Sequence, residues 1–307
     1  MSGVTALFLT PVARIRRQVI RPIAARLAPA SDLAASPLAD RTVLITGASS
    51  GIGEATAYAV ARRGGHVLLV ARRSDELDRV AAAIRADGGS ASTYTADLSD
   101  AAAVDELVAR VLADHDEVHY LVNNAGRSIR RSLALSYDRA HDFERTMAIN
   151  YFAPVRLVLG LLPTMREQGF GHVVNVGTWG TQVKAPKYAA YIASKTALDT
   201  FSRIAGREAW ADGVTFTNMR FALVRTSMVA PTDAYAKLPA LSPERAATKV
   251  VHALEDRPLT VGTIPGAVAE VVNLVAPRLS DLLFASSDRR FPDSDAARAT
   301  TSSDRMR

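Results

Sequence analysis

Tyr191 and Lys195 lie four residues apart, and Thr178 lies thirteen residues before Tyr191. In an α-helix, residues i and i+4 share one face, so the lysine ammonium can lie beside the tyrosine phenol. A nearby positive charge favours the phenolate and lowers the pKa of a tyrosine from its usual value of about 10. Such a phenol can pass a proton to a carbonyl oxygen. A Tyr/Lys pair at this spacing also arises by chance, so its meaning depends on the rest of the chain.

A glycine-rich turn near the start of the chain argues against chance. A short apolar run at 41–45 leads into the sequence TGASSGIG at 46–53, and a helical stretch follows at 54–63. A strand, a glycine turn and a helix together form the setting in which backbone N–H groups bind phosphates. Gly47 permits a tight turn, Gly51 lets the backbone approach a pyrophosphate, and Gly53 permits close packing of helix on strand. The turn therefore predicts a dinucleotide site.

Apolar runs alternate with helical stretches along most of the chain, which is typical of parallel strands joined by crossover helices. We expect strands near 42–46, 66–71, 90–95, 118–122, 171–177, 214–220 and 259–262. No linker interrupts this region, so the sequence predicts one α/β domain at 39–291. The expected fold is a Rossmann-type doubly wound parallel sheet of about seven strands with helices on both faces. The cofactor should lie at the carboxyl ends of the strands.

These features resemble the short-chain dehydrogenase/reductase family over residues 41–291. The glycine turn matches that family's cofactor motif, the sequence NNAG at 123–126 matches its second motif, and Asn150 falls at its catalytic asparagine. The resemblance implies four catalytic residues: Tyr191, Lys195, Thr178 and Asn150. It also implies the following cofactor-binding residues: Thr46, Gly47, Ser49, Ser50, Gly51, Ile52, Gly53, Arg72, Asp97, Leu98, Asn124, Ala125, Gly126, Tyr191, Lys195 and Thr226.

The resemblance also implies a role for each catalytic residue. Tyr191 would protonate the carbonyl oxygen during reduction, and Lys195 would lower the tyrosine pKa and bind the nicotinamide ribose. Thr178 would donate a hydrogen bond to the substrate oxygen, and Asn150 would hold a water that links Lys195 to solvent. Most family members have serine at position 178, and threonine keeps the hydroxyl but stiffens χ1. A second departure follows the sixth strand, where the family often has Pro-Gly and this chain has Phe221-Ala222.

The end of the second strand indicates which dinucleotide is bound. An NAD-preferring site usually ends this strand with a carboxylate that binds the ribose 2′-hydroxyl, and Ala71 occupies that position here. Arg72 follows it, and a guanidinium suits a 2′-phosphate. The alternative is that Arg72 and Arg73 are ordinary loop charges. We therefore predict NADP(H) as the cofactor. The family resemblance also implies that Asp97 is the acid that contacts the adenine.

The segment after the sixth strand resembles the bacterial fatty acyl-CoA reductase-like subgroup, together with stretches at 241–244, 276–281 and 291–294. In this family the residues after Thr226 form the substrate lid, and here they are rich in apolar side chains: Met228, Val229, Tyr235, Leu238 and Leu241. They suit a hydrophobic, lipid-like carbonyl or acyl substrate, or they simply pack the lid on the core. Two alternatives stay open: a long-chain fatty acyl-CoA reductase that makes an aldehyde, and a non-catalytic protein that senses NADP(H).

Composition limits the other classes of function. The chain has no cysteine, which excludes disulfides and thiolate metal sites. Its six histidines are scattered, and we expect surface histidines and no metal site. Residues 1–30 carry five arginines and no acid, so they account for +5 of the chain's net charge of +6. The rest of the chain therefore shows no basic excess that would suggest nucleic-acid binding.

The basic N-terminal arm, residues 1–38, is predicted to be amphipathic. If it is helical, Ile15, Val19, Ile23 and Leu27 share one face, although Pro22 would interrupt the helix. The arm therefore reads as a peripheral membrane contact through residues 1–30, or as a mobile or subunit-docking arm. We expect a cytoplasmic protein, with association with a membrane surface as the alternative, and a disordered tail at 292–307. By resemblance it should form a homo-oligomer.

Overall fold

A seven-stranded sheet organises the chain in this computed structural model, which describes residues 36–229, 238–290, 292–293 and 297–298. The strand order is β3-β2-β1-β4-β5-β6-β7, and all six pairings are parallel. The strands are β1 (Thr42–Thr46), β2 (His66–Ala71), β3 (Ser90–Thr95), β4 (Tyr120–Asn123), β5 (Gly171–Thr178), β6 (Val214–Phe221) and β7 (Thr260–Val261). The predicted strands and the doubly wound α/β fold are confirmed.

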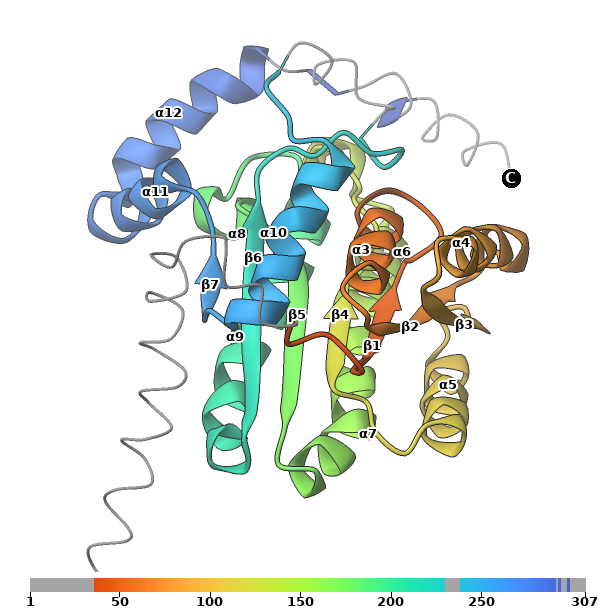
Figure 1. The fold of residues 1–307 in the computed structure, drawn as a ribbon. Coiled ribbons are helices and arrows are strands. Elements are labelled where there is room, and N and C mark those ends of the chain that lie inside the picture. The colour runs from red at the N-terminus through yellow and green to blue at the C-terminus, as the bar shows by residue number, and fades with distance from the viewer. Residues whose placement is uncertain (1–35, 230–237, 291, 294–296, 299–307) are drawn as a thin grey trace, which may run out of the picture.

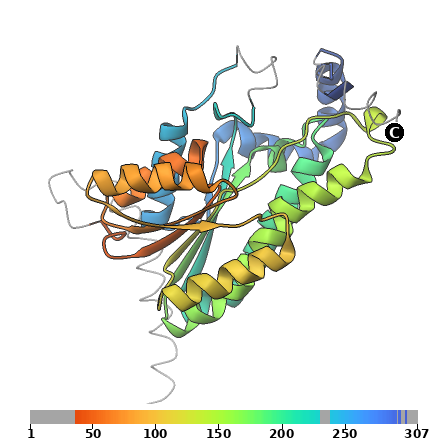
Figure 2. The same cartoon turned by 90° about the vertical axis from the view of Figure 1, so that its right-hand side faces the viewer.

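Helices cover both faces of the sheet, as the two views in Figures 1 and 2 show. One face packs against α3 (Gly51–Ala61), α4 (Ser74–Ala86) and α10 (Pro243–Asp256). The other packs against α5 (Ala101–Asp114), α7 (Ala153–Glu167) and α9 (Ala189–Glu208). Successive strand residues point to opposite faces, so Val43 and Ile45 join the first apolar core while Leu44 joins the second. Both faces are buried, which explains the continuous apolar runs in the sequence.

Strand β1 marks the point where the order of the strands reverses, because β2 pairs with one of its edges and β4 with the other. In open α/β sheets a ligand crevice forms at this point, outside the carboxyl ends of the strands. The glycine turn at 46–53 follows β1 directly. The fold therefore places this turn beside the loop that follows β4.

The remaining helical segments are short or lie near the carboxyl ends of the strands. They are η2 (Leu133–Leu135), α6 (Ala140–Met147), η3 (Ala148–Phe152), α8 (Gly180–Val183), η4 (Trp210–Asp212), α11 (Ile264–Val275) and α12 (Pro277–Arg290). The continuous helix at 140–167 is long and apolar enough to cross a membrane by length and composition. Its residues Leu157, Leu161 and Met165 are buried in the core instead, as in a helix that covers a sheet.

Two histidines contradict the expectation that all six lie at the surface. His172 is fully buried on β5, with Nδ1 2.8 Å from the Thr215 hydroxyl oxygen. Burial lowers its pKa to about 3, so it is neutral. His119 is also buried, and its Nδ1 accepts a hydrogen bond from the backbone N–H of Thr42 at 3.2 Å. Both buried histidines hydrogen-bond to residues of neighbouring strands, a role that a scattered histidine does not reveal in sequence.

Several predictions lie wholly or partly outside the described residues: the arm through residue 35, Tyr235 of the lid, the boundary at 291 and most of the tail. The described part begins at Ser36, and Leu38 is fully buried in the core next to β1. Among the residues that the structure describes, no three His, Cys, Asp or Glu side chains lie together in a way that could hold a metal ion.

Candidate active site

A cavity of about 700 Å³ opens at the carboxyl ends of the strands around β1. It joins the glycine turn, the end of β2, the loops after β4 and β6, and the Tyr/Lys helix α9. The predicted site residues that line it are Gly47, Ser49, Ser50, Gly51, Ile52, Arg72, Leu98, Asn124, Ala125, Gly126, Thr178, Tyr191, Lys195 and Thr226. The fold thus gathers residues that are up to about 180 positions apart in the sequence into one cavity.

Four predicted residues do not line this cavity: Thr46, Gly53, Asp97 and Asn150. Thr46 is buried, and its hydroxyl accepts hydrogen bonds from the backbone N–H groups of Asn124 and Ala125, both at 3.0 Å. It therefore joins the first glycine motif to the second. Asp97 is exposed, and its carboxylate accepts from the N–H of Ser99 at 2.9 Å. That bond stabilises a turn before α5, while Leu98 reaches the cavity.

The glycine turn leaves the backbone open toward the cavity. Gly47 and Gly51 have φ angles of +67° and +61°, which side-chain-bearing residues rarely adopt. A Cβ on Gly53 would lie 2.2 Å from the carbonyl oxygen of Gly47, so this position requires glycine for close packing. Ser50 precedes the first turn of α3 and makes no side-chain cap. The N-terminus of this eleven-residue helix therefore presents N–H groups and a partial positive charge to the cavity.

The end of β2 adds positive charge to the same wall. Ala71, Arg72 and Arg73 all line the cavity, and both arginines are exposed. Arg73 forms an ion pair with Glu76 at 3.8 Å, so part of its charge is already compensated. No carboxylate ends β2, and Arg72 is the first charged side chain after this strand.

Tyr191, Lys195 and Thr178 meet where β5 ends beside α9. All three line the cavity, and the Lys195 ammonium donates to the carbonyl oxygen of Val176 at 2.9 Å. Burial raises the pKa of Tyr191 to about 12, and a hydrogen bond with Thr178 opposes that rise. Burial lowers the pKa of Lys195 to about 8.

The expected direction of the tyrosine pKa is therefore wrong for this structure. We expected the lysine charge to lower it, whereas burial raises it and the Thr178 hydroxyl supplies the opposing interaction. The reason is that burial disfavours the phenolate, while the ammonium is held by the backbone of Val176. A tyrosine of this kind is a protonated donor at neutral pH, which suits delivery of a proton to a carbonyl oxygen.

Asn150 lies behind the cavity in η3, a π-helical turn between α6 and α7. Single π-helical turns within α-helices occur often at functional sites. The Asn150 amide oxygen accepts from the N–H of Arg127 at 2.8 Å, and its amide nitrogen donates to the carbonyl oxygen of Arg127 and to the Ser194 hydroxyl, both at 2.9 Å. A Cβ on Gly126 would lie 2.9 Å from the same amide oxygen. Asn150 therefore clamps the loop after β4 against the helix that carries Tyr191.

A row of buried amides connects the strands to α9. Asn123, Asn175 and Asn218 are register partners on β4, β5 and β6. Asn175 accepts from Asn123 at 2.9 Å and donates to Asn218 at 3.2 Å, and it also contacts the Ser202 hydroxyl. Asn218 donates to the carbonyl oxygen of Asp199 at 3.2 Å. Since Ser202 and Asp199 belong to α9, the row fixes this helix against the sheet next to Lys195.

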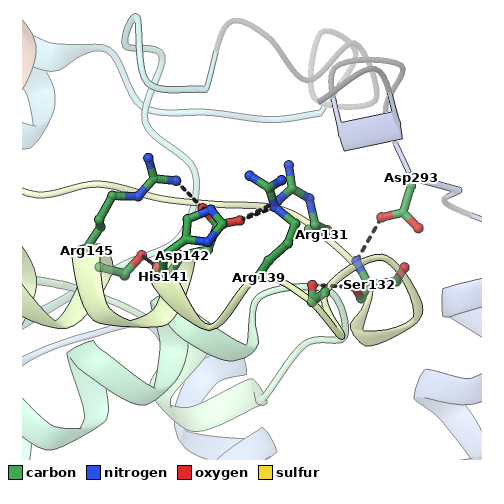
Figure 3. A network of polar contacts seen from close by, with 9 residues as sticks. Arg131, Ser132, Arg139, His141, Asp142, Arg145 and Asp293 are labelled. Carbon is green, nitrogen blue, oxygen red and sulfur yellow. Dashed lines mark hydrogen bonds and ion pairs between the residues drawn. The ribbon is translucent and has the colours of Figure 1, made fainter. Parts of the chain in front are cut away.

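A cluster of charges joins Arg131, in the loop after β4, to α6, as Figure 3 shows. Asp142 on α6 is buried and bonds to Arg131, Arg139 and Arg145. The backbone N–H of Arg131 donates to the carbonyl oxygen of Lys187 at 2.8 Å, which ties this loop to the segment before α9. Neither glycine motif nor Tyr/Lys spacing reveals the cluster, because its members are linked only by the fold.

Part of the cavity wall is apolar. It is lined by side chains from the end of β6 and the segment that follows: Phe221, Leu223, Val224, Met228 and Val229. Thr226 lies opposite the glycine turn, and a Cβ on Gly51 would come within 3.2 Å of its methyl group. Sequence reasoning missed Arg127, Ser128 and Ile149, which also line the cavity. Their positions directly after the second motif and directly before Asn150 were the available signals.

Comparison with known proteins agrees with the family that the sequence motifs predict. The sequence model of the family described as short chain dehydrogenase matches residues 41–236. A fatty acyl-CoA reductase of Acinetobacter baylyi is 46% identical over 257 residues, covering 84% of this chain and 87% of that protein. A fatty acyl-CoA reductase of Mycobacterium tuberculosis is 46% identical over 248 residues, covering 80% of this chain and 84% of that protein.

A solved structure agrees with the fold. The 3-oxoacyl (acyl-carrier-protein) reductase of Agrobacterium tumefaciens, crystallised with NADP bound, superimposes with a TM-score of 0.67 at 28% identity. The match covers 73% of this chain and 93% of that one. With the glycine turn, the second motif and the Tyr/Lys helix around one cavity, this chain belongs to the short-chain dehydrogenase/reductase family and is an oxidoreductase.

Proposed function

We propose that the chain is an NADP(H)-dependent reductase that transfers hydride between the nicotinamide and a carbonyl or alcohol of a hydrophobic, lipid-like substrate. The observation that carries the proposal is the single cavity of about 700 Å³. Three sets of groups line it together: a glycine cradle with Arg72, the Tyr191 and Lys195 side chains, and an apolar wall.

The residues of the cavity fit a dinucleotide. Gly47 and Gly51 leave the backbone open where a pyrophosphate would approach, and the N-terminus of α3 favours negative charge there. Arg72 lines the cavity and would bind a 2′-phosphate, and Ala71 leaves no carboxylate to repel that phosphate. Leu98 and Ala125 line the same cavity and would contact the bound dinucleotide. When bound, the cofactor would supply the hydride.

The catalytic roles follow from the geometry of the chain's own groups. Tyr191, protonated at neutral pH, would donate its proton to the substrate oxygen. The Thr178 hydroxyl hydrogen-bonds the same tyrosine and would hold the substrate oxygen beside it. Lys195, held by the carbonyl of Val176, would place its charge near the developing phenolate. Asn150 would position the loop and helix around this centre.

A fatty acyl-CoA reductase is the second candidate, and the two relatives at 46% identity that carry this name favour it. Hydride addition to a thioester carbon and proton transfer to its oxygen would give a hemithioacetal. Breaking its C–S bond would release an aldehyde and the thiol of coenzyme A. The apolar wall formed by Phe221, Leu223, Met228 and Val229 suits the acyl chain in either reaction.

NADPH oxidation with a substrate panel separates the candidates. The panel contains saturated acyl-CoAs, 3-oxoacyl thioesters, simple ketones and aldehydes of medium and long chain length. Turnover confined to saturated acyl-CoA, with free thiol released in a one-to-one ratio to aldehyde, would establish the second candidate. Turnover of ketones or aldehydes would establish a carbonyl reductase. Tight NADPH binding without turnover of any compound would contradict both and favour a protein that senses NADP(H).

The cofactor preference can be tested with Arg72→Ala. A charged hydrogen bond contributes about 1.5–3 kcal/mol, so NADPH should bind roughly 10- to 100-fold more weakly to the variant. NADH lacks the 2′-phosphate and should bind with nearly unchanged affinity. Titration calorimetry with both dinucleotides measures the difference. Arg62→Ala is the matched control, because Arg62 is an exposed arginine that pairs with Asp87 and lies outside the cavity. Equal losses for NADPH and NADH in Arg72→Ala would refute the assignment.

A further inference from the structure

Helix α11 turns its apolar side away from the protein. The outward arc carries large apolar residues at helical spacing, with exposed fractions between 56% and 83%: Ile264, Val268, Val271, Leu274 and Val275. Amphipathic helices of soluble domains normally show the opposite orientation, with the apolar stripe on the core. The exposed arc of α11 therefore needs an explanation beyond the packing of the domain.

The inward side of α11 is polar, and its contacts fix the orientation of the helix. Glu270 accepts hydrogen bonds from Gln182 at 2.8 Å and from Arg220 at 3.1 Å. Asn273 donates to the carbonyl oxygen of Gln182 at 2.7 Å. A Cβ on Gly266 would lie 2.4 Å from the amide oxygen of Gln182, so the helix sits close to α8. These contacts specify which side of α11 faces outward.

Helix α12 extends the same surface. Leu279, Leu282 and Leu283 are 52%, 72% and 60% exposed, whereas Ser280 points inward and is buried. Figures 1 and 2 show the two helices side by side at one side of the molecule, beyond the edge strand β7. We call the exposed side chains of both helices the C-terminal apolar face: Ile264, Val268, Val271, Leu274, Val275, Leu279, Leu282 and Leu283. Single exposed apolar residues are ordinary, but eight of them on two helices that contact each other indicate an interaction surface.

The charges around the face indicate its partner. Arg278 has a 96% exposed side chain between the two groups of apolar residues and pairs with Asp281 at 3.6 Å, and Lys184 is exposed beside the groove between α11 and α12. The only acid of α11, Glu270, is paired with Arg220. Residues 1–30 add five arginines and no acid. An apolar face on which Glu270 and Asp281 are both paired with arginines, in a chain whose first 30 residues are basic, matches a surface whose interior is hydrocarbon and whose headgroups are anionic.

We propose that the C-terminal apolar face docks this protein on an anionic lipid bilayer, with the arginines of residues 1–30 as the second, electrostatic signal. Stable peripheral binding generally takes two such signals. The N-terminal arm is less suited to cover the face itself, because five arginines would find few negative charges there: Asp281 is already paired with Arg278 at 3.6 Å. The proposal concerns a surface outside the cavity and does not depend on the substrate.

Vesicle binding of the full chain tests the proposal. Co-sedimentation is measured with vesicles of phosphatidylcholine alone and with 30% phosphatidylglycerol. The double variant Leu274→Asp/Leu283→Asp should lower the partition coefficient on anionic vesicles by about 100-fold, since each leucine contributes roughly tenfold when buried in hydrocarbon. Leu133→Asp is the matched control, because Leu133 is 60% exposed like Leu283 but lies in η2, and it should bind vesicles normally. Both variants should bind NADPH with the affinity of the parent chain, which shows that they are folded.

Three results would overturn the proposal. Vesicle binding that is unchanged in the double variant would show that the face does not touch lipid. A double variant that changes from dimer to monomer in analytical ultracentrifugation, with vesicle binding unaltered, would assign the face to a second copy of the chain. Deletion of residues 1–35 should weaken binding to anionic vesicles; stronger binding after the deletion would assign the face to the arm instead.

Discussion

Replacing Tyr191 with phenylalanine is expected to lower kcat for carbonyl reduction by about 10²- to 10⁴-fold, the range for loss of a positioned proton donor. Phenylalanine keeps the ring, including its edge-on contact with Tyr188 at 6.4 Å between centroids, and removes only the hydroxyl. The Kd for NADPH and the thermal stability should stay close to those of the parent chain. Steady-state kinetics and titration calorimetry measure these quantities separately.

The pH dependence of the parent enzyme should follow the two shifted groups. Tyr191 has a pKa of about 12, so it stays protonated and able to donate through the neutral range. Lys195 has a pKa of about 8, so its positive charge is present below this pH and is lost as the pH rises above it. If that charge stabilises the developing phenolate, the reduction rate falls above about pH 8. A rate that is constant from pH 7 to 10 would contradict this role of Lys195.

Tyr188→Phe is the control for the tyrosine prediction. It makes the same chemical change three residues away, and Tyr188 does not line the cavity. Its hydroxyl has no hydrogen-bond partner within the described residues, so its removal costs no bond. We expect its kcat to stay within about threefold of the parent value, because surface or unpaired groups contribute little. Undiminished kcat in Tyr191→Phe, or an equal loss in both variants, would refute the assignment of the proton donor.

The parts of the fold that sequence predicts correctly are those encoded by local pattern. The run at 42–46, with its apolar β-branched residues, could only be a buried strand before a glycine turn. Tyr191 and Lys195 lie on one helix at a spacing that already places them on the same face. The crossover rules then bring the turn and the helix to the same edge of the sheet. Motifs of this kind predict both their own secondary structure and the edge of the sheet at which they lie.

The parts that sequence does not predict depend on contacts between distant residues. Asn123, Asn175 and Asn218 read as ordinary polar residues, and only strand register makes them a hydrogen-bonded row. The pKa of Tyr191 depends on its burial, which the Tyr/Lys spacing does not encode. The outward apolar arc of α11 has the periodicity of a core-facing helix, and its orientation follows from the contacts of Glu270 and Asn273. Periodicity shows that a face exists but not what covers it.

The second large effect is expected at Asp142, whose replacement by asparagine should lower the free energy of unfolding by about 3–5 kcal/mol, the range for breaking a buried ion pair. Its side chain is 5% exposed, and those of Arg131 and Arg139 are 8% and 5% exposed. Asparagine keeps the shape but removes the negative charge that compensates two buried guanidinium groups. Denaturant unfolding of both proteins at pH 7 measures the difference.

Glu144→Gln is the control for this variant. Glu144 lies on the same helix, is exposed, and loses the same charge in the substitution. Its free energy of unfolding should change by less than about 0.5 kcal/mol, as for most surface positions. Equal losses in the two variants would show that the net charge of α6, and not the buried cluster, determines the stability.

The loss in Asp142→Asn should depend on pH in a direction that the cluster fixes. Burial alone would raise the pKa of Asp142, but hydrogen bonds from Arg139 and Arg145 and the charges of Arg139 and Arg131 outweigh it and hold the pKa below its usual value. The folded state therefore binds the proton less readily than the unfolded chain, whose aspartate titrates near pH 3.9. The stabilisation by Asp142 is complete above that pH and is lost as the pH falls through the lower folded value. The two proteins should thus differ most in stability at neutral pH and converge in acid. A difference in stability that grows in acid would exclude the ion pair as its cause. Because Arg131 also bonds the segment before α9, Asp142→Asn should raise the KM for the carbonyl substrate more than the Kd for NADPH.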